Sequence, residues 1–291
     1  MPVFEGKGLS ELTREDLKAF SLSLASPAKC LTANTRNRVL VVGTTALKWA
    51  FENAFITADL TAGIRKFSGE VEKRGVLTPD EARDLFSLEW DDERHYLANF
   101  LAATTGMRAG EIAALKVTDL ADTSIQVRHS WLEGHGLKTP KNGEARTVPV
   151  MPALLKRLVD LARMNPNGIG FVFWNPASSA SPMDSRRFAL QLRRMLTRLR
   201  AGDSATPTEE KLADMYWDER NVVFHSWRHF FSSRMSDSTE DRKVMKLTGH
   251  KTPSVFAGYS EHRLESELAE MGGVAASTFG HLLPSSWEAR A

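Results

Sequence analysis

The sequence is poor in cysteine and lacks long apolar runs. Cys30 is the only cysteine among 291 residues, which excludes a disulfide framework and any thiolate-rich zinc or iron–sulfur site. No apolar run approaches the roughly 18 residues that span a bilayer, and the N-terminal segment MPVFEGKGLS lacks the apolar core of a secretory signal. These absences predict a cytoplasmic protein without a membrane segment.

A strong net charge is also missing, but the charges that are present are sorted along the chain. The 38 basic and 36 acidic residues leave a formal net charge of +2. Residues 80–93 are acidic, whereas residues 186–200 contain no acid and carry Arg186, Arg187, Arg193, Arg194, Arg198 and Arg200. Such a segment can be a solvated helix face, or it can form a positive face for a polyanion.

Length and composition indicate two globular domains. The sequence is 42% hydrophobic and 25% charged, which is typical of folded proteins and excludes wholesale disorder. The first 65 or so residues are predicted to be helical, with a short helix capped by Thr13 and a longer one over Asn37–Asn53. The poorly patterned segment from Ile56 to Phe67, followed by the charged GEVEKRGV, is interpreted as the linker.

From Leu77 onward the pattern predicts a mostly α fold with a small antiparallel β-sheet (α+β). Thr78 and Pro79 have the order of a helix cap and first turn. Strands are expected at 124–132 and 144–150, with a hairpin turn at Asn142-Gly143, and residues 202–220 are expected to form a loop or surface insertion. Further helices are predicted at 93–104, after TGMRAGE, and at 151–164, 182–200, 225–235 and 239–248.

Four separated segments carry cations or hydroxyl groups that suit phosphate chemistry. They are TGMRAGE with Arg108, LKTPKNGEARTVPV with Lys138 and Lys141, HSWRHFFSS with His225 and Arg228, and LTGHKTPSVFAGY with His250 and Tyr259. Taken one at a time, each has an ordinary structural explanation, such as a salt-bridged arginine, a solvated lysine or a helix C-cap. Glu111, in the helix after Arg108, is predicted to position an arginine or a backbone amide.

Together, and in this order, the four segments resemble the signature of the tyrosine recombinases, the phage integrase family. The resemblance covers about Leu77 to His262 and extends more weakly backward through ALKWAFENAFITADLTAGIRKF. It implies a helical DNA-clamping domain at 1–66, apparently shortened, a linker at 67–76 and a catalytic domain at 77–263. It also implies a C-terminal tail at 264–291 that packs on a neighbouring protomer.

The reaction that the resemblance implies is cutting and rejoining of DNA through a 3′-phosphotyrosyl intermediate, without metal, ATP or other cofactor. Tyr259 is the implied nucleophile, and Arg108 and Arg228 would hold the phosphate, because a guanidinium can donate two hydrogen bonds to its oxygens. Lys138 would protonate the leaving 5′-oxygen, with Lys141 as the alternative. The roles of the remaining two catalytic candidates, His225 and His250, stay open.

The implied partner is double-stranded DNA with specific recombination sites, bound by a homotetramer in the cytoplasm, at the nucleoid of a prokaryotic host. An accessory directionality factor is a further possible partner. The residues proposed to contact DNA are Arg186, Arg187, Arg193, Arg194, Arg198 and Lys141. Two alternatives remain, a type IB topoisomerase that relaxes supercoils and a non-cleaving DNA-binding protein descended from an integrase.

Overall fold

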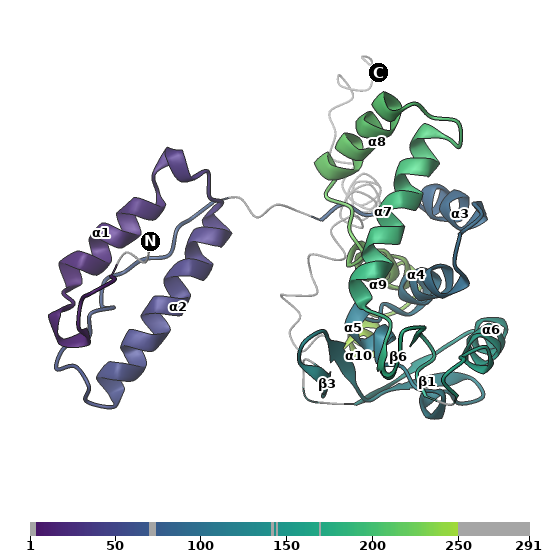
Figure 1. Cartoon of the computed structure of the whole chain (residues 1–291), viewed down its shortest axis with the longest axis horizontal. Helices are drawn as coiled ribbons and strands as arrows, with labels where there is room; N and C mark the ends of the chain where they lie inside the picture. Colours follow the sequence, from purple (N-terminus) through teal and green to yellow (C-terminus); the bar gives the residue numbers. More distant parts are fainter. Residues whose placement is uncertain (1–3, 70–73, 141–142, 144, 169, 250–291) are drawn as a thin grey trace, which may run out of the picture. The chain divides into compact units, whose positions relative to one another are not determined.

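The computed structural model describes residues 4–69, 74–140, 143, 145–168 and 170–249, and the chain divides into two compact units, 1–73 and 74–291 (Figure 1). Among the described residues no helix is long and apolar enough to cross a membrane. The predicted linker and tail boundaries stay predictions, and the tail lies outside the described residues.

The described part of unit 1 contains two short 3₁₀ turns and two α-helices that are joined by Ala25 to Thr32. The elements are η1 (Leu9–Glu11), α1 (Arg14–Leu24), η2 (Pro27–Lys29) and α2 (Ala33–Glu52). Thr13 caps α1 in a capping box with Asp16, as the sequence predicts. Residues beyond α2 return along it, since the Asn37 side chain exchanges two hydrogen bonds with the Phe67 backbone, at 2.9 and 2.8 Å.

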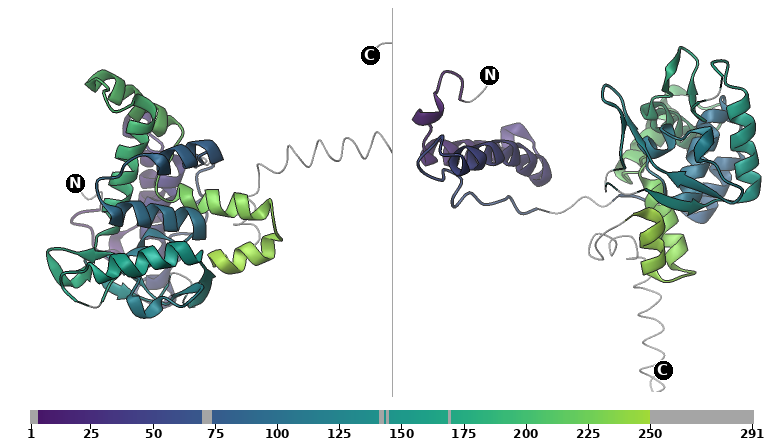
Figure 2. Two further views of the ribbon diagram at one scale, coloured as in Figure 1. Left: turned by 90° about the vertical axis from the view of Figure 1, so that its right-hand side faces the viewer. Right: turned by 90° about the horizontal axis from the view of Figure 1, so that it is seen from below.

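Unit 2 is mostly helical with small antiparallel sheets, which confirms the predicted fold class. Its helices are α3 (Pro79–Ser87), α4 (Glu93–Thr105), α5 (Ala109–Ala113), η3 (Val117–Asp119), α6 (Pro152–Arg163), α7 (Ser185–Ala201), α8 (Pro207–Glu219), α9 (Ser226–Ser236) and α10 (Asp241–Thr248). Its strands are β1 (Ser124–Val127), β2 (Ser130–Leu132), β3 (Gly136–Lys138), β4 (Arg146–Pro149), β5 (Trp174–Asn175) and β6 (Ser178–Pro182). The strands and α6 gather at the end of unit 2 opposite α8 (Figures 1 and 2).

Helix α4 forms the centre of unit 2. Leu97, Ala98 and Leu101 are fully buried on it. The buried Asn99 amide donates to the Phe188 carbonyl of α7 (3.3 Å) and accepts from the Trp227 indole of α9 (2.9 Å). Because a buried amide is costly to leave unpaired, these bonds fix α7 and α9 relative to α4.

The hairpin has four strands instead of the two predicted. β1 pairs with β4, and β2 pairs with β3. The reversal between β2 and β3 uses Gly134 and Gly136, both at positive φ, which suits glycine. In the segment of the predicted turn, the Gly143 N–H donates to the Pro140 carbonyl (2.7 Å). Its prediction as the hairpin turn is wrong, however, because it connects β3 to β4, which do not pair with each other.

The predicted loop at 202–220 is also wrong, because most of it forms α8. Thr206 caps the helix in a capping box with Glu209, and Pro207 occupies the first turn. Trp217 is buried against α7, where its indole N–H donates to the Leu196 carbonyl (2.7 Å). The polar residues of the segment form the exposed face of α8. Its buried face consists of only Ala213 and Trp217, so the sequence shows little apolar pattern.

Candidate functional site

Arg108 lies at the start of α5, immediately after α4 ends. Gly106 terminates α4 in the left-handed region (φ 65°), and a Cβ there would lie 2.6 Å from the Phe231 ring. The buried Glu111 carboxylate accepts from the Arg108 backbone N–H (2.9 Å) and from Arg108 Nη1 (2.8 Å). Glu111 therefore positions both an arginine and a backbone amide, as predicted.

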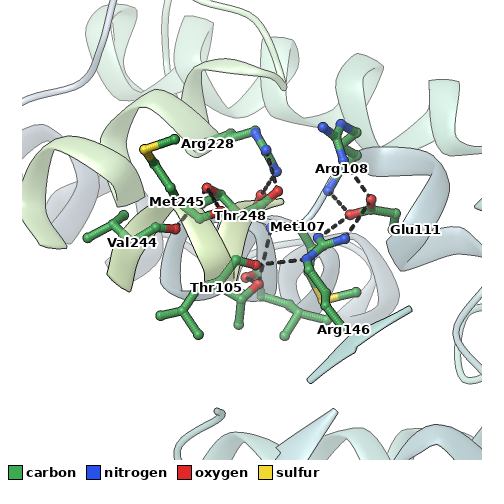
Figure 3. Close-up of polar contacts among 12 residues, drawn as sticks. Thr105, Met107, Arg108, Glu111, Arg146, Arg228, Val244, Met245 and Thr248 are labelled. Atoms are coloured by element: carbon green, nitrogen blue, oxygen red, sulfur yellow. Dashed lines mark hydrogen bonds and ion pairs between the residues drawn. The ribbon is translucent and has the colours of Figure 1, made fainter. Parts of the chain in front are cut away.

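Arg146, which the sequence analysis did not single out, completes this cluster. Its Nη1 and Nη2 donate to the two oxygens of Glu111 at 3.0 and 2.6 Å, and its Nε donates to the Leu247 carbonyl at 2.7 Å (Figure 3). Burial alone would raise the pKa of Glu111, but hydrogen bonds and charge from Arg146 and Arg108 hold this pKa below its usual value. Glu111 is thus an ionised carboxylate shared by two arginines.

Arg228 is buried, at 1% exposure, and it joins the ends of two helices. Its Nη1 donates to the Gly106 carbonyl at the end of α4 (2.8 Å), and its Nη2 donates to the Thr248 carbonyl at the end of α10 (Figure 3). The neighbouring Trp227 is fully buried and stacks on Phe86 with ring centroids 5.1 Å apart. Packing of the indole therefore fixes the first turn of α9, from which Arg228 extends.

His225 lies beside this arginine pair, at the N-cap of α9. Its ring contacts the ring of His229 with centroids 5.6 Å apart. Burial, the neighbouring His229 and the positive charges of Arg228, Arg74 and Arg108 lower the pKa of His225 to about 4. His225 is nevertheless an exposed residue, so an incoming ligand can reach a ring that is neutral at neutral pH.

Three arginines act on the histidines, and the sequence analysis singled out only two of them. Both Arg228 and Arg108 act on His225, which places these three predicted residues in one neighbourhood. Arg74 acts on His225 and on His229, whose pKa burial and charge also lower to about 4. The sequence analysis assigned Arg74 to the linker, and no motif around it signals proximity to the site.

Lys138 is exposed at the end of β3, opposite Ser130 on β2. This strand position differs from the turn position expected from the sequence. Three other predicted site residues, Lys141, His250 and Tyr259, lie outside the described residues.

Four of the six arginines of α7 form ion pairs on the surface. The pairs are Arg186 with Asp184, Arg193 with Asp214 and Asp218, Arg194 with Asp91, and Arg198 with Asp203. Arg187 is exposed and, within the described part of the chain, forms no ion pair. The guanidinium of Arg200 lies 3.5 Å from the centroid of the Tyr216 ring, and Tyr216 belongs to α8, not to an irregular insertion.

The arrangement suits an anion better than a cation. Arg108 and Arg228 are held by carbonyl and carboxylate oxygens, beside neutral histidines that can form hydrogen bonds. In residues 4–69, 74–140, 143, 145–168 and 170–249, no group of three or more histidine, cysteine or acidic side chains is arranged to hold a metal ion.

Comparisons with known proteins agree on one family. The profile of the phage integrase family matches residues 75–265. The tyrosine recombinase XerC of Mesorhizobium japonicum is 24% identical over 241 residues, which are 70% of this chain and 68% of that protein. The fold matches the Tn1549 transposon integrase in complex with circular intermediate DNA (TM-score 0.67, 19% identity, 91% of this chain and 86% of that chain). It also matches a lambda integrase tetramer bound to a Holliday junction (TM-score 0.62, 18% identity, 87% of this chain and 66% of that chain).

Proposed function

Because the chain belongs to the phage integrase family, the tyrosine recombinases that break and rejoin DNA at specific sites, we propose that Arg108 and Arg228 bind the scissile phosphate and Tyr259 attacks it. The family match confirms the resemblance that the motifs indicated. One observation carries the assignment of the arginines: both are held in place at the same turn of the chain. Glu111 binds Arg108, and the carbonyl of Gly106, two residues before Arg108, accepts from Arg228.

The two arginines would act on charge that develops during the reaction. In the pentacoordinate transition state, negative charge grows on the non-bridging phosphate oxygens. Donors that are already fixed in place stabilise that charge without reorganising. The bonds that Arg228 makes to Gly106 and Thr248 supply this rigidity, so the proposed clamp is assembled before DNA arrives.

The proposed step exchanges one phosphate ester for another. The Tyr259 oxygen forms a bond to phosphorus and gives its proton to His225 or His250. The bond from phosphorus to the 5′-oxygen breaks, and that oxygen leaves as a hydroxyl after receiving a proton from Lys138. A second 5′-hydroxyl then reverses the step. The exposure of Lys138 at the end of β3 supports this role, since its flexible side chain can reach a bound duplex.

His225 is proposed to form a hydrogen bond to the phosphate while neutral. Its pKa of about 4 reflects burial and surrounding positive charge. A bound phosphate would offset that charge and raise the pKa of His225 toward the range useful for proton transfer. His250 is proposed to share the two tasks of hydrogen bonding and proton acceptance.

DNA binding is proposed to involve both units. In unit 1, a hollow of about 250 Å³ is lined in part by Lys48, Arg65 and Lys66, which supports a role in gripping the duplex. In unit 2, we propose that Lys141 and five arginines of α7 contact the phosphate backbone, namely Arg186, Arg187, Arg193, Arg194 and Arg198. Surface ion pairs are worth about 0–1 kcal/mol, so phosphates can displace the carboxylates.

Assembly is proposed to follow the lambda integrase, which forms a tetramer on a Holliday junction. Segment 264–291 would pack on a neighbouring protomer, with residues 1–66 as the clamping domain, 67–76 as the linker and 77–263 as the catalytic domain. A prokaryotic nucleoid is the proposed place of action, and a directionality factor a proposed additional partner.

The test is capture of a covalent complex. The full chain is incubated with a library of randomised DNA duplexes that carry a nick, which traps cleaved product, and protein-linked DNA is recovered under denaturing conditions and sequenced. We expect an enriched sequence and an adduct that Y259F does not form. A chain that binds DNA but never forms an adduct would contradict the proposal. Relaxation of a supercoiled plasmid with a single site would favour topoisomerase-like activity instead.

A further inference from the structure

We propose that Arg146 is a positioning residue for strand cleavage. It connects the proposed phosphate clamp to the end of α10. This inference rests on the proposed function. Arg146 begins β4, directly after the segment that follows Lys138, and its side chain is 11% exposed. Its partners belong to α5 and to α10 (Figure 3), so one side chain joins three elements that are distant in sequence.

The first role follows from the shared carboxylate. Glu111 binds Arg146 through both oxygens and binds Arg108 through the same two oxygens. Arg146 neutralises the carboxylate, so the cluster keeps one net positive charge for the phosphate. Without Arg146, the buried carboxylate would attract the Arg108 guanidinium more strongly and compete with the phosphate for its donors.

The second role concerns the last turn of α10. The final carbonyls of a helix lack partners within the helix. In α10, the carbonyl of Leu247 accepts a hydrogen bond from Arg146, and the next carbonyl, of Thr248, accepts one from Arg228. Gly249 then ends the helix in the left-handed region (φ 71°). The two arginines therefore fix the point from which the chain continues to His250 and Tyr259.

These two roles predict a defect in the chemical step more than in DNA binding. Loss of Arg146 would shift Arg108 and the exit from α10 together. A displacement of about 1 Å at a catalytic group can cost about 100-fold in rate. The Arg146 guanidinium is occupied by Glu111 and Leu247, so its removal takes away no proposed phosphate contact.

The experiment compares R146M with R94M, a matched control. Arg94 on α4 is similarly enclosed, at 16% exposure, and likewise binds one carboxylate, of Asp92, and one carbonyl, of Trp174. The full-length variants are mixed in excess with the nicked duplex selected by covalent capture. The single-turnover cleavage rate, the DNA dissociation constant and the melting temperature are measured for each.

We expect R146M to cleave about 100-fold more slowly than wild type, with a dissociation constant close to wild type. R146K should recover part of the rate, because it restores the charge but not the planar fork. R94M should lower the melting temperature with little effect on cleavage. Equal cleavage by R146M and wild type, or equal slowing in R94M and R146M, would overturn the inference.

Further readouts keep the inference separate from the proposed function. If wild type itself forms no adduct, the proposed function fails first. If R146M does not fold, R146K decides, and a wild-type rate for R146K overturns the inference.

A duplex with a 5′-bridging sulfur supplies a leaving group that needs no proton, so it should restore cleavage by K138M but not by R146M. Restoration of R146M would overturn the proposed route through Arg108 and α10.

Discussion

Two sets of arginines in unit 2 have similar partners but different surroundings. Arg228 is buried and bound to two backbone carbonyls, and Arg108 is bound to a carboxylate that is itself 1% exposed. On α7, Arg194 is 69% exposed and pairs with Asp91, which is 57% exposed. The arginines of the proposed site therefore differ from those of α7 in how firmly the guanidinium is held, and not in their charge.

The difference has a physical basis. Two exposed charges gain little from pairing, because water screens them and their side chains lose conformational freedom. Buried arginines bound to rigid backbone keep one orientation, and their charge is weakly screened. We therefore expect substitutions in the first set to affect catalysis and substitutions on α7 to affect affinity.

The largest effect is expected from R228K. Lysine lacks the planar guanidinium and therefore cannot bind both carbonyls and the phosphate at once. Loss of one fixed donor to a transition state costs about 100- to 1,000-fold in rate. Single-turnover cleavage of the captured duplex measures it. The comparison breaks down if R194K on α7 loses as much rate as R228K.

A second large effect is expected from E111Q. The glutamine keeps the shape but removes the charge between Arg108 and Arg146, and breaking a buried ion pair costs about 3–5 kcal/mol of unfolding free energy. Urea denaturation monitored by circular dichroism measures this. The matched variant is D214N, whose carboxylate is 47% exposed beside Arg193, and for which about 0–1 kcal/mol is expected. Similar losses in both would contradict the distinction.

A smaller effect is expected from the double variant R187M/R194M. If these arginines bind phosphates, the slope of log affinity against log salt should fall by about 0.9 for each phosphate that the variant no longer neutralises. Fluorescence anisotropy with the captured duplex over a salt series gives the slope. An unchanged slope would remove α7 from the proposed DNA interface.

The smallest effect concerns pH and stability. The pKa values of His225 and His229 are lowered to about 4 in the folded protein. The unfolded chain therefore takes up protons first as the pH falls from about 6.5 toward about 4, and stability decreases over that window. The melting temperature should be lower near pH 5 than near pH 7.

The double variant H225N/H229N should weaken this pH dependence. Burial also lowers the pKa of His95, so part of the dependence should remain. An identical profile in the variant and wild type would show that burial and nearby positive charge do not lower the pKa values of the two histidines.

Sequence reasoning found the local features of this site and missed the distant ones. Arg108 and Glu111 are three residues apart, so one short motif revealed their relation. Arg146 bonds to residues 35 and 101 positions away, and no local pattern encodes such partners. The missed helix α8 is different, because its capping box at Thr206 and Glu209 was readable, but the polar composition of the segment outweighed it.

Gly106 has no side chain at the point where α4 meets Arg228, one of the two arginines of the proposed clamp. Gly106 presents its hydrogen to Phe231 and Thr248 where a methyl group would lie 2.6 and 3.1 Å from their carbons, and its carbonyl receives Arg228. Any bulkier residue there would force α4 away from α9, spreading Arg228 from Arg108. A spread pair could still attract DNA while failing to grip a single phosphate, so the enzyme would bind its substrate and leave it uncut.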